Sequence, residues 1–105
     1  MKQYTTPEQT AQLIELGFER PQGYAEGECY SDIYPAYSIG ELIEMLPLLQ
    51  TDADNEDWPL SIEAGCNLEY SSWFVYYVPE NIVEKPELID ALYEMIVKLK
   101  EEKII

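Results

Sequence analysis

The chain has 105 residues, 47% of them hydrophobic, and this length and composition predict one folded domain spanning residues 1–105. Its 21 acidic residues against 6 basic ones give a formal net charge of −15. Phosphate backbones and anionic membrane surfaces repel such a surface, so we expect neither direct nucleic-acid binding nor membrane binding. The charge favours a protein partner with a basic surface and leaves homo-oligomers open; solubility alone is the other interpretation.

The chain contains no histidine. This absence excludes serine–histidine and cysteine–histidine nucleophiles, and it removes the commonest transition-metal ligand and the usual near-neutral general base. Catalysis by carboxylates alone would need a substrate cleft, which a domain of this size rarely frames by itself. We therefore expect a protein that is not an enzyme and that needs no cofactor.

The two cysteines, Cys29 and Cys66, indicate a reducing compartment rather than a disulfide scaffold. Neither lies beside a histidine or in a CxxC pair, so structural burial is expected for both, and their redox state is left open. The start, MKQYTTPEQT, lacks the apolar stretch of a secretion signal, and no apolar run reaches the roughly 18 residues of a membrane span. These features predict a cytoplasmic protein.

Two helices are predicted in the first half of the chain. A capping box of Thr6 and Gln9 begins a helix over residues 7–16, which Gly17 ends. A second capping box, Ser38 with Glu41, begins a helix that ends near residue 45 or 46, before Pro47. Between the helices, residues 29–34 could form a short strand, with Pro35 at its end or at an edge.

The second half of the chain predicts a β-hairpin followed by a helix. Residues 60–64 alternate apolar and polar positions, residues 65–69 indicate a turn, and residues 70–78, YSSWFVYYV, form a second strand with two bulky faces. The last helix begins around residues 86–87 and buries an apolar stripe, with Glu94 and Lys98 as an ion pair on its polar face. The order α-(β)-α-β-β-α predicts an α+β fold, with three helices packed on a small antiparallel sheet.

The acidic stretch TDADNEDWPLSIE, residues 51–63, has the approximate ligand spacing of a calcium loop. An EF-hand needs glycine where Asp57 stands and a backbone amide where Pro59 stands, and a helix after the loop where the sequence predicts a strand. A solvated connector is the favoured interpretation, because carboxylates in water carry no desolvation penalty. A weak divalent-cation site remains the alternative, and its ligands would be Asp52, Asp54, Glu56 and Asp57.

The nine tyrosines and two tryptophans are many for this length. Such side chains bury much area at interfaces for little loss of entropy, so they favour protein recognition. Five of the tyrosines could share one exposed sheet face: Tyr24, Tyr30, Tyr34, Tyr70 and Tyr76. Core packing is the preferred role for four other aromatic residues: Trp58, Trp73, Phe74 and Tyr77.

Two segments, YSIGELIEMLP (residues 37–47) and LIDALYEMIVKLKEE (residues 88–102), are similar to segments of small proteins of unknown function from gut anaerobic bacteria and their phages or mobile elements. The resemblance implies a small cytoplasmic bacterial or phage protein, and it carries no activity and no site residue. Phages and mobile elements have reason to encode inhibitors of DNA-binding enzymes. Charge mimicry of DNA is therefore an alternative function.

We predict a non-enzymatic protein-interaction module that acts through an acidic and aromatic surface. A DNA mimic that inhibits a DNA-binding protein and a weak cation-binding protein are the alternatives. The mimic would take its charges from the acidic stretch and from carboxylates on the two later helices. The candidate interaction residues are Tyr24, Tyr30, Tyr34, Glu41, Glu44, Asp90 and Glu94.

Overall fold

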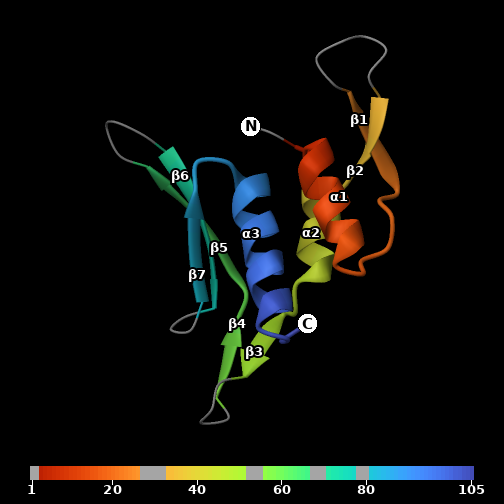
Figure 1. Ribbon diagram of the computed structural model, residues 1–105. Coiled ribbons are helices and arrows are strands. Elements are labelled where there is room, and N and C mark those ends of the chain that lie inside the picture. The colour runs from red at the N-terminus through yellow and green to blue at the C-terminus, as the bar shows by residue number, and fades with distance from the viewer. Residues whose placement is uncertain (1–2, 27–32, 52–55, 67–70, 78–80) are drawn as a thin grey trace.

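The computed structural model describes residues 3–26, 33–51, 56–66, 71–77 and 81–105 (Figure 1). These residues form an α+β fold with three helices and seven strands. The helices are α1 (Pro7–Glu15), α2 (Ile39–Met45) and α3 (Leu88–Glu101). The strands are β1 (Gly23–Glu26), β2 (Ile33–Ala36), β3 (Leu49–Thr51), β4 (Asp57–Pro59), β5 (Ser61–Cys66), β6 (Ser71–Tyr77) and β7 (Asn81–Lys85).

Both predicted capping boxes are confirmed. At the start of α1 the Gln9 backbone N–H donates to the Thr6 hydroxyl over 3.2 Å, and the Thr6 backbone N–H donates to Oε1 of Gln9 over 3.0 Å. Ser38 and Glu41 make the same reciprocal pair at the start of α2. After α1, Gly17 has a φ of 102°, a left-handed value that favours glycine and ends the helix.

The predicted hairpin of two strands is confirmed as β5 and β6, and the sheet has a third strand that the sequence did not predict. β6 pairs antiparallel with both β5 and β7. The predicted turn was placed too early, because Gly65 and Cys66 continue β5. Residues 67–70 lie outside the described residues.

Two smaller antiparallel pairs complete the described strands. β1 pairs with β2, whereas the sequence predicted one short strand at residues 29–34, of which 29–32 lie outside the described residues. Pro35 lies within β2. Proline has no backbone N–H to donate, and a two-stranded sheet tolerates it because both of its strands are edge strands. β3 pairs with β4, so part of the acidic stretch, Thr51 and residues 57–59, forms strands where a connector was predicted.

The core of the described residues is a hydrophobic cluster centred on α3. Figure 1 shows α3 between the sheet of β5, β6 and β7 on one side and α2 on the other. The helix is therefore apolar over more of its circumference than an ordinary surface helix. Its buried residues are Leu88, Ile89, Ala91, Leu92, Met95, Ile96 and Leu99.

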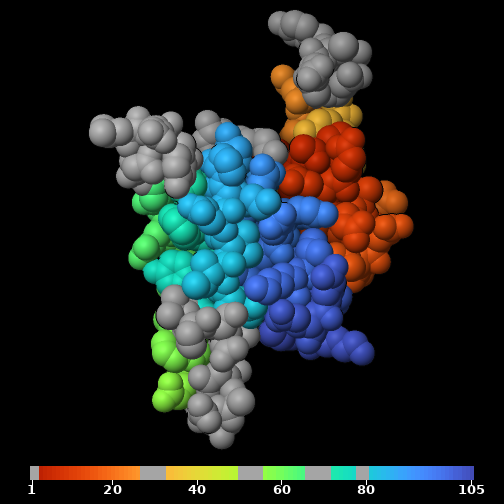
Figure 2. All heavy atoms as spheres, turned by 60° about the vertical axis from the view of Figure 1, so that its left-hand side comes forward, coloured from red at the N-terminus to blue at the C-terminus, as the bar shows by residue number. Residues whose placement is uncertain are grey.

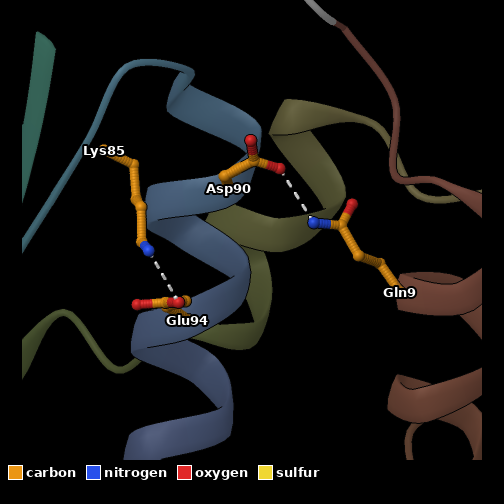
Figure 3. Close-up of polar contacts among 4 residues, drawn as sticks. All are labelled: Gln9, Lys85, Asp90 and Glu94. Atoms are coloured by element: carbon orange, nitrogen blue, oxygen red, sulfur yellow. Dashed lines mark hydrogen bonds and ion pairs between the residues drawn. The ribbon is translucent and has the colours of Figure 1, made fainter.

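Polar contacts also tie α3 to α1 and to β7 (Figure 3). The Gln9 side-chain amide of α1 donates to Oδ1 of Asp90 over 2.8 Å. On the other side of the helix, Nζ of Lys85 in β7 lies 3.0 Å from Oε1 of Glu94. The ion pair of Glu94 therefore joins two elements, whereas the sequence predicted a pair with Lys98 inside the helix.

Two buried tyrosines fix connecting segments to the core. The Tyr37 hydroxyl donates to the backbone carbonyl of Glu19, and the Tyr77 hydroxyl donates to that of Pro47. Burial raises the pKa of Tyr77 to about 12. Burial, and secondarily the charge of Glu41, also raises the pKa of Tyr37. Each hydroxyl satisfies a carbonyl at the point where the chain leaves a helix, so each ring has both a packing and a polar role.

The central place of α3 predicts a large cost for truncating it. Leu92 is 0% exposed, so Leu92→Ala should lower the free energy of unfolding by about 2–5 kcal/mol in chemical denaturation. Leu48 is 77% exposed, and the matched change Leu48→Ala should cost less than about 0.5 kcal/mol. Equal costs for the two changes would contradict the described core.

Tyr77 predicts a loss of stability at alkaline pH. The unfolded phenol ionises near pH 10 and the folded one near 12, so its contribution is complete below pH 10 and falls as pH rises towards 12. Tyr77→Phe keeps the ring and removes the ionisable hydroxyl. At neutral pH it should lower the free energy of unfolding by about 1 kcal/mol, because one hydrogen bond is lost. Chemical denaturation across this pH range should show that the variant loses less of its free energy of unfolding at alkaline pH. If the variant loses as much as the unchanged protein, another group causes the alkaline effect.

Candidate functional site

The sheet of β5, β6 and β7 has an inner and an outer face, and the residues alternate between them. Ile62, Val75 and Val83 are opposite one another on the inner face, and all three belong to the core cluster or pack against it. The opposite face, the outer face, carries two rows of side chains that each run across all three strands. One row is Ser61, Tyr76 and Ile82, and the other is Glu63, Phe74 and Glu84.

None of the described helices or strands covers the outer face. Figure 1 shows α3 on one side of the sheet and no described element on the other, and in Figure 2 the strands (green to light blue) come forward beside α3 (darker blue). Ile82 is accordingly 56% exposed, and Phe74 and Tyr76 are half-buried by their neighbours on the same face.

Phe74 occupies the place that a side chain at position 65 would take. A Cβ built on Gly65 would lie 2.5 Å from Cε2 of the Phe74 ring and 3.3 and 3.6 Å from the two atoms bonded to it. These distances describe an edge-on approach. The missing side chain of Gly65 therefore lets the ring edge settle on β5 while the two π faces of the ring point away from that glycine.

Hydroxyl groups of β6 hold both carboxylates of the outer face. The Tyr76 hydroxyl donates to Oε1 of Glu63 over 2.7 Å, and the Ser72 hydroxyl donates to Oε2 of Glu84 over 2.9 Å. The hydrogen bond to Glu63 is the main cause of a raised pKa at Tyr76, because it stabilises the protonated phenol. Both carboxylates thus have a preferred position beside an aromatic ring.

The predicted tyrosines do not share one sheet face. Tyr24 and Tyr34 lie in the sheet of β1 and β2, whereas Tyr76 lies in the sheet of β5, β6 and β7. Tyr24 is opposite Pro35 and Tyr34 is opposite Ala25, so these two tyrosines also point to opposite faces of their own sheet. The remaining two, Tyr30 and Tyr70, lie outside the described residues.

The hairpin of β1 and β2 has its own exposed apolar face. Tyr24 is 67% exposed and Ile33 is 63% exposed, and Figure 2 shows the hairpin (orange to yellow) projecting from the body. Tyr34 points the other way, and its hydroxyl donates to the carbonyl of Thr5 over 3.1 Å, which anchors the N-terminal segment. This hairpin face carries one described carboxylate, Glu26, so it combines aromatic and acidic groups less fully than the outer face.

The four predicted acidic interaction residues lie on α2 and α3. The Glu41 carboxylate accepts backbone N–H groups from Ser38 and Gln22, so it caps α2 and holds the preceding loop. Glu44 is exposed beside a hollow of about 310 Å³ that Glu41 also lines. Asp90 and Glu94 make the contacts that tie α3 to its neighbours.

The candidate cation ligands Asp52 and Asp54 lie outside the described residues. The described part of the acidic stretch continues into β4, a strand, which agrees with the prediction that no second EF-hand helix follows it. Within the described ranges, no group of three or more cysteine or acidic side chains is placed to hold a metal ion.

Sequence reasoning assigned Phe74 to the core and gave no role to Glu84 or Ile82. The alternation in YSSWFVYYV predicts two bulky faces but not which one a helix covers. The segment NIVEK, which forms β7, alternates exposed and buried positions over only five residues. That short pattern was the available signal for a third strand.

No described helix is long and apolar enough to span a membrane. Comparisons with known protein families, with curated proteins and with solved structures find no match to this chain. The resemblance of residues 37–47 and 88–102 to small proteins of gut anaerobes and phages therefore stays a prediction.

The contact between Gly65 and Phe74 predicts a coupling that a double-mutant cycle can measure. Gly65→Ala forces the ring away and should cost about 1 kcal/mol, as overpacked sites do. With Phe74→Leu already present, the same change should be neutral or slightly stabilising, because alanine narrows the unfolded ensemble. The measurement is the free energy of unfolding of the four proteins, and additive effects would contradict the contact.

Proposed function

We propose that the protein is a non-enzymatic interaction module that binds a basic segment of a partner protein on the outer face of the sheet. The observation that carries this proposal is an uncovered sheet face on which two aromatic rings alternate with two carboxylates held in place by hydroxyl groups. Aromatic side chains supply apolar contact area, and the carboxylates select for positive charge.

Electrostatics supports a basic partner over a second copy of the chain. With a formal net charge of −15, two copies repel each other, and a self-complementary contact through this face would bring Glu63 and Glu84 of one copy near those of the other. A cationic partner is instead attracted over distances of about a Debye length, which raises its rate of association. Binding should therefore weaken as salt rises.

Other features of the chain are consistent with a binding role. The sequence has no histidine, and its two cysteines fit a reducing compartment such as the cytoplasm. In the described ranges, the titrating groups whose pKa is clearly shifted are tyrosines on which burial or a neighbouring carboxylate acts. Such shifts are typical of packed tyrosines and indicate no acid–base pair poised for catalysis near pH 7.

Charge mimicry of DNA stays a prediction with less support. Three of the carboxylates that would imitate phosphates, Glu41, Asp90 and Glu94, make hydrogen bonds or an ion pair within the protein. Lysines on β7 and α3 also interrupt a uniform acidic strip. A weak cation site at residues 52–57 likewise stays a prediction.

A titration with hexalysine amide, followed residue by residue by NMR, tests the proposed face. The largest changes in amide chemical shift should lie in β5, β6 and β7, because this sheet carries the carboxylates of Glu63 and Glu84. The double variant Glu63→Gln/Glu84→Gln should weaken binding at least about threefold, since charge-assisted contacts are lost. Amide side chains keep an oxygen that accepts the Tyr76 and Ser72 hydroxyls, so the fold should persist.

The matched control is Glu8→Gln/Glu102→Gln, which removes the same number of charges from exposed positions on α1 and after α3. This variant should bind hexalysine nearly as well as the unchanged protein. If the two double variants weaken binding equally, or if the shifts centre on the helices, binding reflects net charge and the proposed face is wrong.

A further inference from the structure

We propose that Phe74 and Glu84 form a subsite for the guanidinium group of an arginine, so that the partner docks through arginine in preference to lysine. The inference rests on the proposed function, since it assigns chemistry to one part of the outer face.

The Phe74 ring meets β5 by its edge, so neither π face lies against Gly65, and we assign these faces to the ligand. The nearest ring atom to the position of a Gly65 side chain is Cε2, and its bonded neighbours are farther away on both sides. The electron-poor rim of the ring therefore faces the strand, whereas the electron-rich faces are turned elsewhere. A cation within about 6 Å of the centroid of such a face is attracted by the ring quadrupole.

Glu84 is the cross-strand partner of Phe74, and its carboxylate reaches the row of residues over which that ring leans. Ser72 is the cross-strand partner of Gly65, and its hydroxyl donates to Oε2 of Glu84. Glu84 and Phe74 therefore both lean over the row formed by Gly65 and Ser72, on neighbouring strands spaced roughly 5 Å apart. Ser72 in this row is buried although it lies on the uncovered side of the sheet.

The position of the carboxylate is fixed while part of its hydrogen-bonding capacity stays available. The Ser72 hydroxyl engages one of the two carboxylate oxygens, Oε2. A carboxylate accepts several hydrogen bonds, so a ligand can add donors without displacing Ser72. A fixed carboxylate also loses less side-chain entropy when a ligand binds.

A guanidinium group matches this pair better than an ammonium group does. It is planar, so it stacks on an aromatic face, and its N–H donors lie in the plane and point past the ring edge towards a carboxylate beside it. The ammonium of lysine is compact and strongly hydrated, so it gains less from the ring. An uncharged apolar side chain would leave Glu84 without a counter-charge.

The same chain offers few arginines of its own. Arg20 is the single arginine in the sequence, since the remaining five of the 6 basic residues are lysines. It lies beside the hollow lined by Glu19 and Glu41, away from the strands of this sheet. Docking of Arg20 from a second copy would also bring two chains of net charge −15 together. We therefore assign the subsite to an arginine of a basic partner.

The test compares hexa-arginine amide with hexalysine amide, which carry equal charge and the same fluorophore, by fluorescence anisotropy at fixed salt. The unchanged protein should bind hexa-arginine about tenfold more tightly, in line with a desolvated cation–π contact. Phe74→Leu keeps an apolar side chain and should abolish most of this preference. It should change the affinity for hexalysine by less than about twofold, because lysine makes little use of the ring.

Phe18→Leu is the matched control. It removes the other phenylalanine of the chain, whose ring centroid lies 5.4 Å from Nζ of Lys100. This change should leave the preference for arginine unchanged. Glu84→Gln should weaken hexa-arginine more than the exposed-site change Glu102→Gln does. NMR spectra of each variant first establish that it is folded.

The outcomes separate this inference from the proposed function. If both peptides bind the outer face equally well, or if Phe74→Leu retains the preference, the arginine subsite is wrong and the interaction face stands. If neither peptide responds to Glu63→Gln/Glu84→Gln, the face itself is wrong. Loss of the preference in Phe74→Leu alone, with Phe18→Leu unaffected, supports the subsite.

Discussion

The burial of α3 is the constraint on which the rest of the structure depends. An amphipathic surface helix needs one apolar partner, but α3 buries residues on both sides and therefore needs two. The sheet of β5, β6 and β7 covers one side, α2 covers the other, and the Gln9–Asp90 hydrogen bond joins α1 to α3. All three described helices of this 105-residue chain therefore lie on the same side of the sheet of β5, β6 and β7. None of them is left to cover the other side.

The outer face of the sheet is uncovered because all three described helices lie on its other side. A three-stranded antiparallel sheet can stay stable with one wet face when the other face is packed. Such a face normally carries small or polar side chains, whereas this one carries Phe74, Tyr76 and Ile82. The two carboxylates beside them keep the face compatible with water. The same combination is the one on which the proposal of a cationic partner rests.

Local signals predicted the helices well because helix caps are local. Thr6 with Gln9 and Ser38 with Glu41 fix two helix starts within four residues, and the structure confirms both. The β structure needed information from farther along the chain. β7 is short, and its identity as a strand depends on pairing with β6 and on contacts with α3. Sequence patterns contain no direct record of those contacts.

The candidate site was hidden for the same reason. Its residues were visible as a tyrosine-rich and carboxylate-rich composition, but which of them meet is set by strand register. Tyr24 and Tyr76 look equivalent in the sequence and lie in separate sheets. Glu41, Asp90 and Glu94 look like free surface charges, and each makes a contact that supports the fold. Register brought Glu84 to Ser72 and placed Phe74 over Gly65.

The geometry of Glu63 and Glu84 also bears on whether the acidic surface is functional or only solubilising. A carboxylate that serves solubility alone needs no fixed position, and freedom to move in water is favourable for it. Here each carboxylate accepts a hydrogen bond from a hydroxyl group of β6. Glu63 is bound by Tyr76 and Glu84 is the cross-strand partner of Phe74, and neither aromatic residue belongs to the core cluster. Each hydrogen bond favours one position of its carboxylate and so restricts that side chain. That restriction costs entropy in the free protein, and a bound cation is the partner that would gain from it.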